Sequence, residues 1–160
     1  MPDDWTELLD RHGPALLLYA RQLAAGRADA EDAVQEGFVR FWSGRARAAD
    51  AAGYLFACVR SAALDARRSS GRRLRREQAA ARPEGLFDAP PEDAAFAPAV
   101  ERALAGLAAE QREVLTLRIW GGLTFPQIAE AVGIPVNTAS SRFRYALSAL
   151  RERLSPEDLP

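Results

Sequence analysis

The sequence predicts an all-α protein, made of two small helical modules joined by a flexible acidic linker. Its long segments rich in Ala, Leu and Arg lack the apolar–polar alternation that is typical of strands. Within these segments apolar residues recur three and four positions apart, which is the spacing of one helix face. Residues 77–97 are instead rich in proline and acidic side chains, a composition that favours a linker. The expected modules are therefore residues 1–76 and residues 98–160.

Composition and charge exclude several classes of protein. The 160 residues carry 21 basic side chains, all of them Arg, and 22 acidic ones, for a net charge of -1. Net charge therefore does not indicate nucleic-acid binding, and only a local cluster of basic side chains can do so. The single cysteine, Cys58, excludes an internal disulfide and a cysteine-based metal site. No apolar run approaches membrane-spanning length, and the acidic residues 1–4 do not resemble a signal peptide. A reducing, cytoplasmic compartment fits, with no membrane insertion and no cofactor.

The first module should contain three helical regions. The first has a break at Gly13–Pro14 and ends near Gly26, because proline interrupts helical hydrogen bonding. Asp29 is a suitable N-cap for a helix over residues 30–42. This helix has Phe41 and Trp42 on or near its inner face. Residues 43–52 should form a loop or weak helix, followed by a helix over residues 53–68.

Positive charge is concentrated at the end of this module. Residues 60–76 contain seven arginines and one acid, Asp65, and Ser69–Ser70–Gly71 interrupts the helical pattern. Such a cluster attracts phosphate, which gives salt-dependent binding. The alternative is a solvated helix end, where arginines also complement the helix dipole. Nearby aromatic rings could stack on unpaired bases or belong to the core. The seven arginines are Arg60, Arg67, Arg68, Arg72, Arg73, Arg75 and Arg76.

The second module should consist of four helices. Two short helices are expected over residues 100–107 and 109–120, the second ending at Gly121–Gly122 with Trp120 packed inside. Thr124 and Gln127 then have the spacing of a capping box at the start of a third helix. Gly133 suits a left-handed residue at the end of that helix. The fourth helix should begin near residue 135 or 136.

These last two helices have the pattern of a helix-turn-helix, whose second helix enters the major groove of DNA. Small polar side chains let that helix lie close to base edges, and arginines can pair with phosphate or guanine. The alternative is a plain helical hairpin with a solvated polar face. The candidate DNA-contacting residues on this face are Asn137, Thr138, Ser141, Arg142, Arg144 and Tyr145.

Three segments, in this order, resemble a known family. Two of them resemble the region-two signatures of bacterial RNA polymerase sigma factors of the sigma-70 family, in the extracytoplasmic-function (ECF) group. These two segments are residues 28–38 (ADAEDAVQEGF) and residues 54–68 (YLFACVRSAALDARR). Residues 109–115 (AEQREVL), together with the helix-turn-helix, resemble region four. The resemblance covers nearly the whole chain, including the linker.

The resemblance implies a transcription initiation factor that directs core RNA polymerase to promoters. Its partners would be promoter DNA and the polymerase clamp and flap, and the resemblance alone suggests an anti-sigma factor as a further partner. The second module would read the duplex minus-thirty-five element, and the linker would thread toward the RNA exit path. The clamp would be bound by Asp32, Gln35 and Glu36. The melted minus-ten element would be held by Tyr54, Arg60, Ser61, Arg67, Arg68, Arg72 and Arg73.

Two other classes of function remain open at this point. A stand-alone helix-turn-helix regulator would bind duplex DNA without polymerase, and a helical interaction adaptor would bind only protein. An enzyme is disfavoured, because the sequence has no catalytic triad, phosphate loop or metal cluster. The single histidine, His12, lies beside the expected helix break, where a capping or solvated role is expected.

Overall fold

The computed structural model describes residues 4–44, 50–74 and 97–154, and within these ranges the chain forms α-helices and no strands. This confirms the all-α fold class. The helices are α1 (Asp4–Leu23), α2 (Arg27–Gly44), α3 (Ala51–Leu74), α4 (Ala97–Ala105), α5 (Ala109–Ile119), α6 (Phe125–Val132) and α7 (Val136–Arg153).

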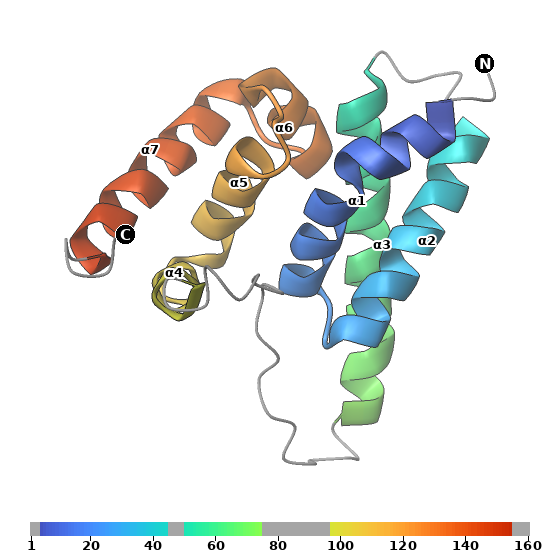
Figure 1. The fold of residues 1–160 in the computed structure, drawn as a ribbon, viewed down its shortest axis with the longest axis horizontal. Helices are drawn as coiled ribbons and strands as arrows, with labels where there is room; N and C mark the ends of the chain where they lie inside the picture. Colours follow the sequence, from blue (N-terminus) through green and yellow to red (C-terminus); the bar gives the residue numbers. More distant parts are fainter. Residues whose placement is uncertain (1–3, 45–49, 75–96, 155–160) are drawn as a thin grey trace.

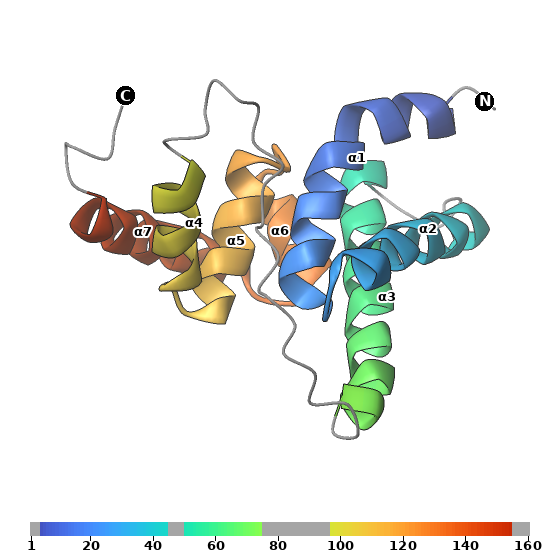
Figure 2. The same ribbon diagram turned by 60° about the horizontal axis from the view of Figure 1, so that its bottom comes forward.

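Helices α1 to α3 form the first module, with α2 and α3 packed closely along each other (Figure 1). The expected break at Gly13–Pro14 is wrong, because α1 continues through both residues. Proline removes one helical hydrogen bond without necessarily ending the helix, and the ribbon of α1 bends instead (Figure 2). Packing of Leu16 and Tyr19, which are fully buried, compensates for the lost hydrogen bond.

Two more boundaries of the first module differ from the sequence prediction. Asp29 is not an N-cap, since α2 begins at Arg27 and Asp29 lies in its first turn. Helix α3 continues through residues 69–71 to Leu74. The expected loop over residues 43–52 is shorter, because its ends belong to α2 and α3, and residues 45–49 lie outside the described ranges.

Helices α4 to α7 form the second module as expected. The capping box is present: the backbone N–H of Gln127 donates to Thr124 Oγ1, and the backbone N–H of Thr124 donates to Gln127 Oε1. Gly133 has a φ of 77° at the end of α6, the left-handed conformation that glycine adopts without strain. Trp120 differs from the prediction, because it is 37% exposed.

The two modules pack against each other. Helix α6 lies against α3, and α5 lies against α1 (Figures 1 and 2). One apolar cluster therefore includes Leu16 and Val59 of the first module together with Val114, Leu117 and Ile128 of the second. The linker predicted at residues 77–97 falls almost wholly outside the described residues.

Candidate nucleic-acid interface

The turn between α6 and α7 fixes the direction of α7. Gly133 and Ile134 both donate backbone hydrogen bonds to Ala129 O, at 2.9 and 3.0 Å, which ends α6 and turns the chain into α7. Phe125 and Phe143 then pack edge to face, with ring centroids 5.5 Å apart, so α6 and α7 are held at a defined angle. This is the rigid support that a groove-reading helix needs.

Helix α7 carries every residue that the sequence predicted for duplex DNA. Asn137, Arg144 and Tyr145 are exposed, and Tyr145 has 61% of its surface open to solvent. The Arg144 guanidinium lies 5.8 Å from the centre of the Tyr145 ring, close enough for a cation–π interaction. The other three predicted residues are half-buried: Thr138, Ser141 and Arg142.

Three of the predicted minus-ten residues, Arg60, Ser61 and Arg68, line one polar cleft between α3 and residues 130–133 at the end of α6. Arg67 and Arg68 are exposed near the end of α3, and the Arg68 side chain is 81% open to solvent. Ser61 is exposed but accepts a hydrogen bond of 3.0 Å from Arg40 Nη1. Tyr54 is half-buried, with its ring 5.7 Å from that of Phe41. Arg72 and Arg73 belong to α3, but their side chains lie outside the described part of the structure.

Arg60 points toward the second module. Its Nε lies 2.6 Å from Glu113 Oε1, and Tyr19 OH donates to the same oxygen. The Glu113 side chain is only 10% exposed. Burial by itself would lower the pKa of Arg60, but the hydrogen bond and negative charge of Glu113 raise it overall. Burial and then the Glu113 charge raise the pKa of Tyr19 well above its usual value.

Two more polar pairs join the modules. Gln22 Nε2 donates to Thr116 Oγ1 at 2.7 Å, and Gln127 Nε2 donates to Asp50 Oδ2 at 2.7 Å. Sequence reasoning missed Glu113, Thr116 and Asp50. Glu113 and Thr116 lie in the buried run of α5, residues 113–117, so a polar residue within an apolar helix pattern was the available signal.

The predicted clamp-binding residues lie on α2. Asp32, Gln35 and Glu36 are all exposed, as the helical spacing predicted. Glu36 Oε1 accepts a hydrogen bond of 3.1 Å from Arg40 Nε, one turn further along. Asp32, Gln35 and Glu36 thus form a polar strip on the outer face of the helix, and Arg40 pairs with one of its two carboxylates.

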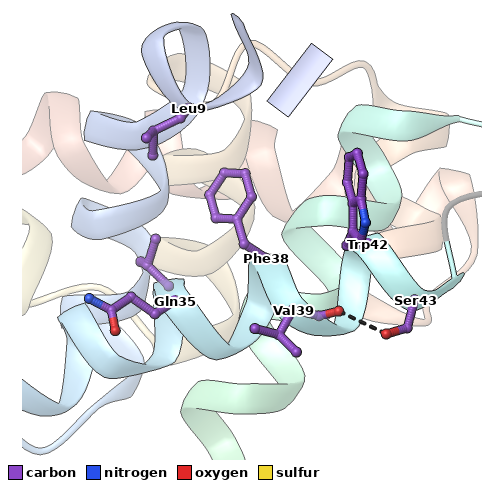
Figure 3. Close-up of a pocket in the computed structure, with 7 residues that line it drawn as sticks. Leu9, Gln35, Phe38, Val39, Trp42 and Ser43 are labelled. Carbon is purple, nitrogen blue, oxygen red and sulfur yellow. Dashed lines mark hydrogen bonds between the residues drawn. The ribbon is translucent and has the colours of Figure 1, made fainter. Parts of the chain in front are cut away.

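An apolar groove of about 590 Å³ adjoins this strip, between α1 and α2 (Figure 3). Phe38 and Trp42 project from α2 on the side facing Leu9 of α1, and Val39 flanks them. Trp42 is 41% exposed and Val39 is 61% exposed. The expectation that Trp42 lies inside or near inside the module is therefore wrong, since it lies at the margin where α1 no longer covers α2. Sequence reasoning did not identify this groove.

The single histidine, His12, packs within the first module. The ring of His12 packs edge to face on Phe56, with centroids 5.7 Å apart, which replaces the expected capping or solvated role. Burial, and then the charge of Arg11, lower the pKa of His12. Among the described residues, no three His, Cys, Asp or Glu side chains are grouped to hold a metal ion. No described helix is both long and apolar enough to cross a membrane.

Comparison with known proteins agrees with this arrangement. Residues 8–73 match the family model for sigma-70 region 2, and residues 98–150 match the model for sigma-70 region 4. The ECF RNA polymerase sigma factor SigL of Mycobacterium tuberculosis is 35% identical over 90% of this chain and 85% of SigL. The RNA polymerase sigma-E factor of Streptomyces avermitilis is 32% identical over 98% of this chain and 88% of its own length.

A solved structure has the same overall fold. The sigma factor RpoE of Bartonella quintana, crystallised with the anti-sigma factor NepR, superposes with a TM-score of 0.69 at 26% identity, covering 96% of this chain and 97% of RpoE. The two family models match the two modules one by one, and the relatives match along nearly the whole chain. The chain belongs to the sigma-70 family of RNA polymerase sigma factors, in the extracytoplasmic-function group.

Proposed function

We propose that this chain carries out promoter recognition by a sigma factor through three separate surfaces, one each on α2, α3 and α7. As an ECF sigma factor it is a transcription initiation factor that directs core RNA polymerase to promoters. The main support for this proposal is the character of α7. Its outer face is exposed and polar and has no acidic side chain before Glu152, and the capped helix α6 holds it rigidly. A stand-alone regulator is not favoured by the family relationship.

Helix α7 reads the minus-thirty-five element in duplex DNA. Asn137 is exposed in its first turn, and Ser141 lies one turn further along. In helix-turn-helix proteins this end of the recognition helix contacts base edges. Arg144 lies two turns from the start, where contact with phosphate anchors the helix. Thr138, Arg142 and Tyr145 supply contacts at the edges of the same face.

Helix α3 holds the melted minus-ten element. Arg67 and Arg68 project from its exposed end and would neutralise phosphates of the single strand. Tyr54, Arg60 and Ser61 lie nearer its start and would contact the bases or the backbone. Arg72 and Arg73 belong to the same helix and are proposed as further contacts to the strand.

Helix α2 binds the clamp of core polymerase. The polar strip of Asp32, Gln35 and Glu36 carries two carboxylates that suit a basic partner surface. The adjoining groove with Val39 and Trp42 adds apolar area for the same contact. The second module contacts the flap, and the acidic linker at residues 77–97 threads toward the RNA exit path. This work takes place in the cytoplasm and requires no cofactor and no enzymatic activity of the chain.

We also propose an anti-sigma factor as a regulatory partner. The support is the structural likeness to RpoE, which was crystallised with such a factor.

Co-purification with core polymerase tests the clamp assignment. Asp32→Arg with Glu36→Arg should abolish co-purification, because both carboxylates become repulsive toward a basic surface. A matched control is Glu110→Arg with Glu152→Arg, which changes net charge equally at exposed carboxylates of the second module. Circular dichroism should show unchanged helicity in both variants. Wild-type recovery of polymerase by the α2 variant would refute the clamp assignment.

A second experiment, transcription from a promoter library, identifies the promoter. Holoenzyme assembled from the chain and core polymerase of the encoding bacterium transcribes a library with randomised upstream elements, and sequencing of the transcribed members defines both elements. A chain that never supports specific transcription, despite co-purifying with polymerase, would refute the proposed function.

A further inference from the structure

Arg40 of α2 joins its own helix to α3 through three hydrogen bonds. Its Nε donates to Glu36 Oε1 at 3.1 Å within α2, and its Nη1 donates to Ser61 Oγ at 3.0 Å and to Asp65 Oδ2 at 2.9 Å on α3. One guanidinium therefore satisfies three acceptors on two helices, which the fixed fork of its donors allows. Arg40 thus lies beside the residues proposed to hold the melted strand, although the sequence did not identify it for that role.

Asp65 is the one acid in the basic segment of the chain. Residues 60–76 contain seven arginines and this single carboxylate. Asp65 lies one helical turn after Ser61 and one turn before Arg68, and all three line the same polar cleft. The Asp65 side chain is exposed. An unpaired carboxylate at this position would repel the phosphates of a strand that lies along α3.

The two carboxylate oxygens of Asp65 have different neighbours. Oδ2 lies 2.9 Å from Arg40 Nη1, whereas Oδ1 lies 4.0 Å from Arg68 Nη1, at the limit of an ion pair. The side chain of Arg68 is largely open to solvent. Without Arg40, Asp65 would draw Arg68 into a closer pair, because that guanidinium is already near and is exposed enough to move. A guanidinium that binds a carboxylate has fewer donors left for phosphate.

We propose that Arg40 is a positioning residue of the minus-ten surface. It neutralises Asp65 from the neighbouring helix, and so leaves Arg68 available for a phosphate of the melted strand. The same guanidinium fixes the hydroxyl oxygen of Ser61 on this face. This inference rests on the proposed role of α3, and it adds a residue of α2 that acts on the strand through Asp65 and Arg68.

The salt dependence of strand binding tests this role. The probe is a fluorescein-labelled single-stranded oligonucleotide with the minus-ten sequence that the promoter library defines. Purified holoenzyme binds it in an anisotropy titration, so a change in affinity for core polymerase does not enter the measurement. Arg40→Ala should make the slope of log affinity against log salt shallower by about 0.7, the loss of one phosphate contact on a single strand. This loss corresponds to about fivefold weaker binding at roughly 0.1 M salt.

Further variants separate charge neutralisation from a purely structural role. Asp65→Asn in the Arg40→Ala background restores the net charge of the wild type and removes the carboxylate that would capture Arg68. The slope should then return to the wild-type value, with affinity within about twofold. A role limited to holding α2 on α3 would not be rescued in this way. Arg40→Gln keeps a donor for Ser61 without the charge and should lower the slope as Arg40→Ala does. Arg11→Ala, which removes an exposed ion pair with Glu7 on α1, is the matched control and should change nothing.

The outcomes distinguish this inference from the proposed function. Arg68→Ala should lower the slope in the wild type but have no further effect in the Arg40→Ala variant, because the two changes remove the same contact. An unchanged slope in Arg40→Ala and Arg40→Gln, or a slope that Asp65→Asn does not restore, would overturn the role of Arg40. An unchanged slope when Arg68→Ala is made in the wild type would instead overturn the proposed role of α3. Circular dichroism should show wild-type helicity in each variant, since exposed ion pairs contribute little to stability.

Discussion

Replacing Gly37 by Ala should destabilise the first module, because the backbone of α3 leaves no room for a Cβ at this position. The added Cβ would lie 2.4 Å from Val59 Cγ2, 2.8 Å from Val59 Cα and 2.9 Å from Val59 N. The Cγ2 methyl can rotate away, but Cα and N belong to the helix backbone. Helices α2 and α3 must therefore separate by roughly 0.6 Å to restore an ordinary contact.

The size of the effect follows from two opposing contributions. Overpacking of a helix interface costs roughly 1–3 kcal/mol, while Ala in a helix interior is favoured over Gly by roughly 0.8–1 kcal/mol. The expected net loss in the free energy of unfolding is roughly 0–2 kcal/mol, measured by urea unfolding followed by far-ultraviolet circular dichroism.

Gly53→Ala is the matched control for this prediction. Gly53 is also buried in a helix, but its Cβ would lie 3.5 Å from Gln127 O and 3.6 Å from Gln127 Cβ, which are ordinary contacts. This variant should gain up to about 1 kcal/mol. If both variants are equally stable, or if Gly37→Ala is the more stable, the close approach of α2 to α3 is incorrect.

Two further predictions concern the DNA-binding surfaces. Replacing Arg67 and Arg68 by Ala should weaken open-complex formation at all promoters and reduce its salt slope by about 0.7 for each lost phosphate contact on single-stranded DNA; an unchanged slope would mean that both side chains are only solvated. On the recognition helix, Asn137→Ala and Ser141→Ala should change which upstream elements are preferred, by about 1–3 kcal/mol per lost base contact. Arg144→Ala should instead weaken all upstream elements alike, and the opposite pattern across a randomised library would reverse the assignment of readout and anchoring.

The helix-turn-helix could be predicted from sequence because its signals are local. The capping box of Thr124 with Gln127 and the left-handed Gly133 each depend on residues within a few positions of one another. The outward placement of Asp32 and Glu36 followed from helical spacing in the same way. The residue roles on both surfaces stay predictions.

Helix boundaries and the contact between the modules were harder, because they depend on tertiary packing. Helix α1 runs through Pro14 because the buried Leu16 and Tyr19 after the bend, and the half-buried Leu8 before it, all pack on the same core. Glu113 meets Tyr19 and Arg60 across sequence separations of 94 and 53 residues, and no local pattern specifies such a pair. Trp42 was misplaced because periodicity identifies a helix face but not where the covering helix ends.

The shared apolar cluster has a consequence for how the chain competes for core polymerase. If polymerase binds only the separated modules, packing of Leu117 and Ile128 against the first module reduces the fraction of chains that are competent to bind. Each 1.4 kcal/mol that favours the packed form lowers the apparent affinity for polymerase about tenfold. Substitutions at these positions would thus alter the cellular concentration at which the chain displaces rival initiation factors from a limited pool of polymerase. They would do so without changing any residue proposed to contact polymerase or promoter.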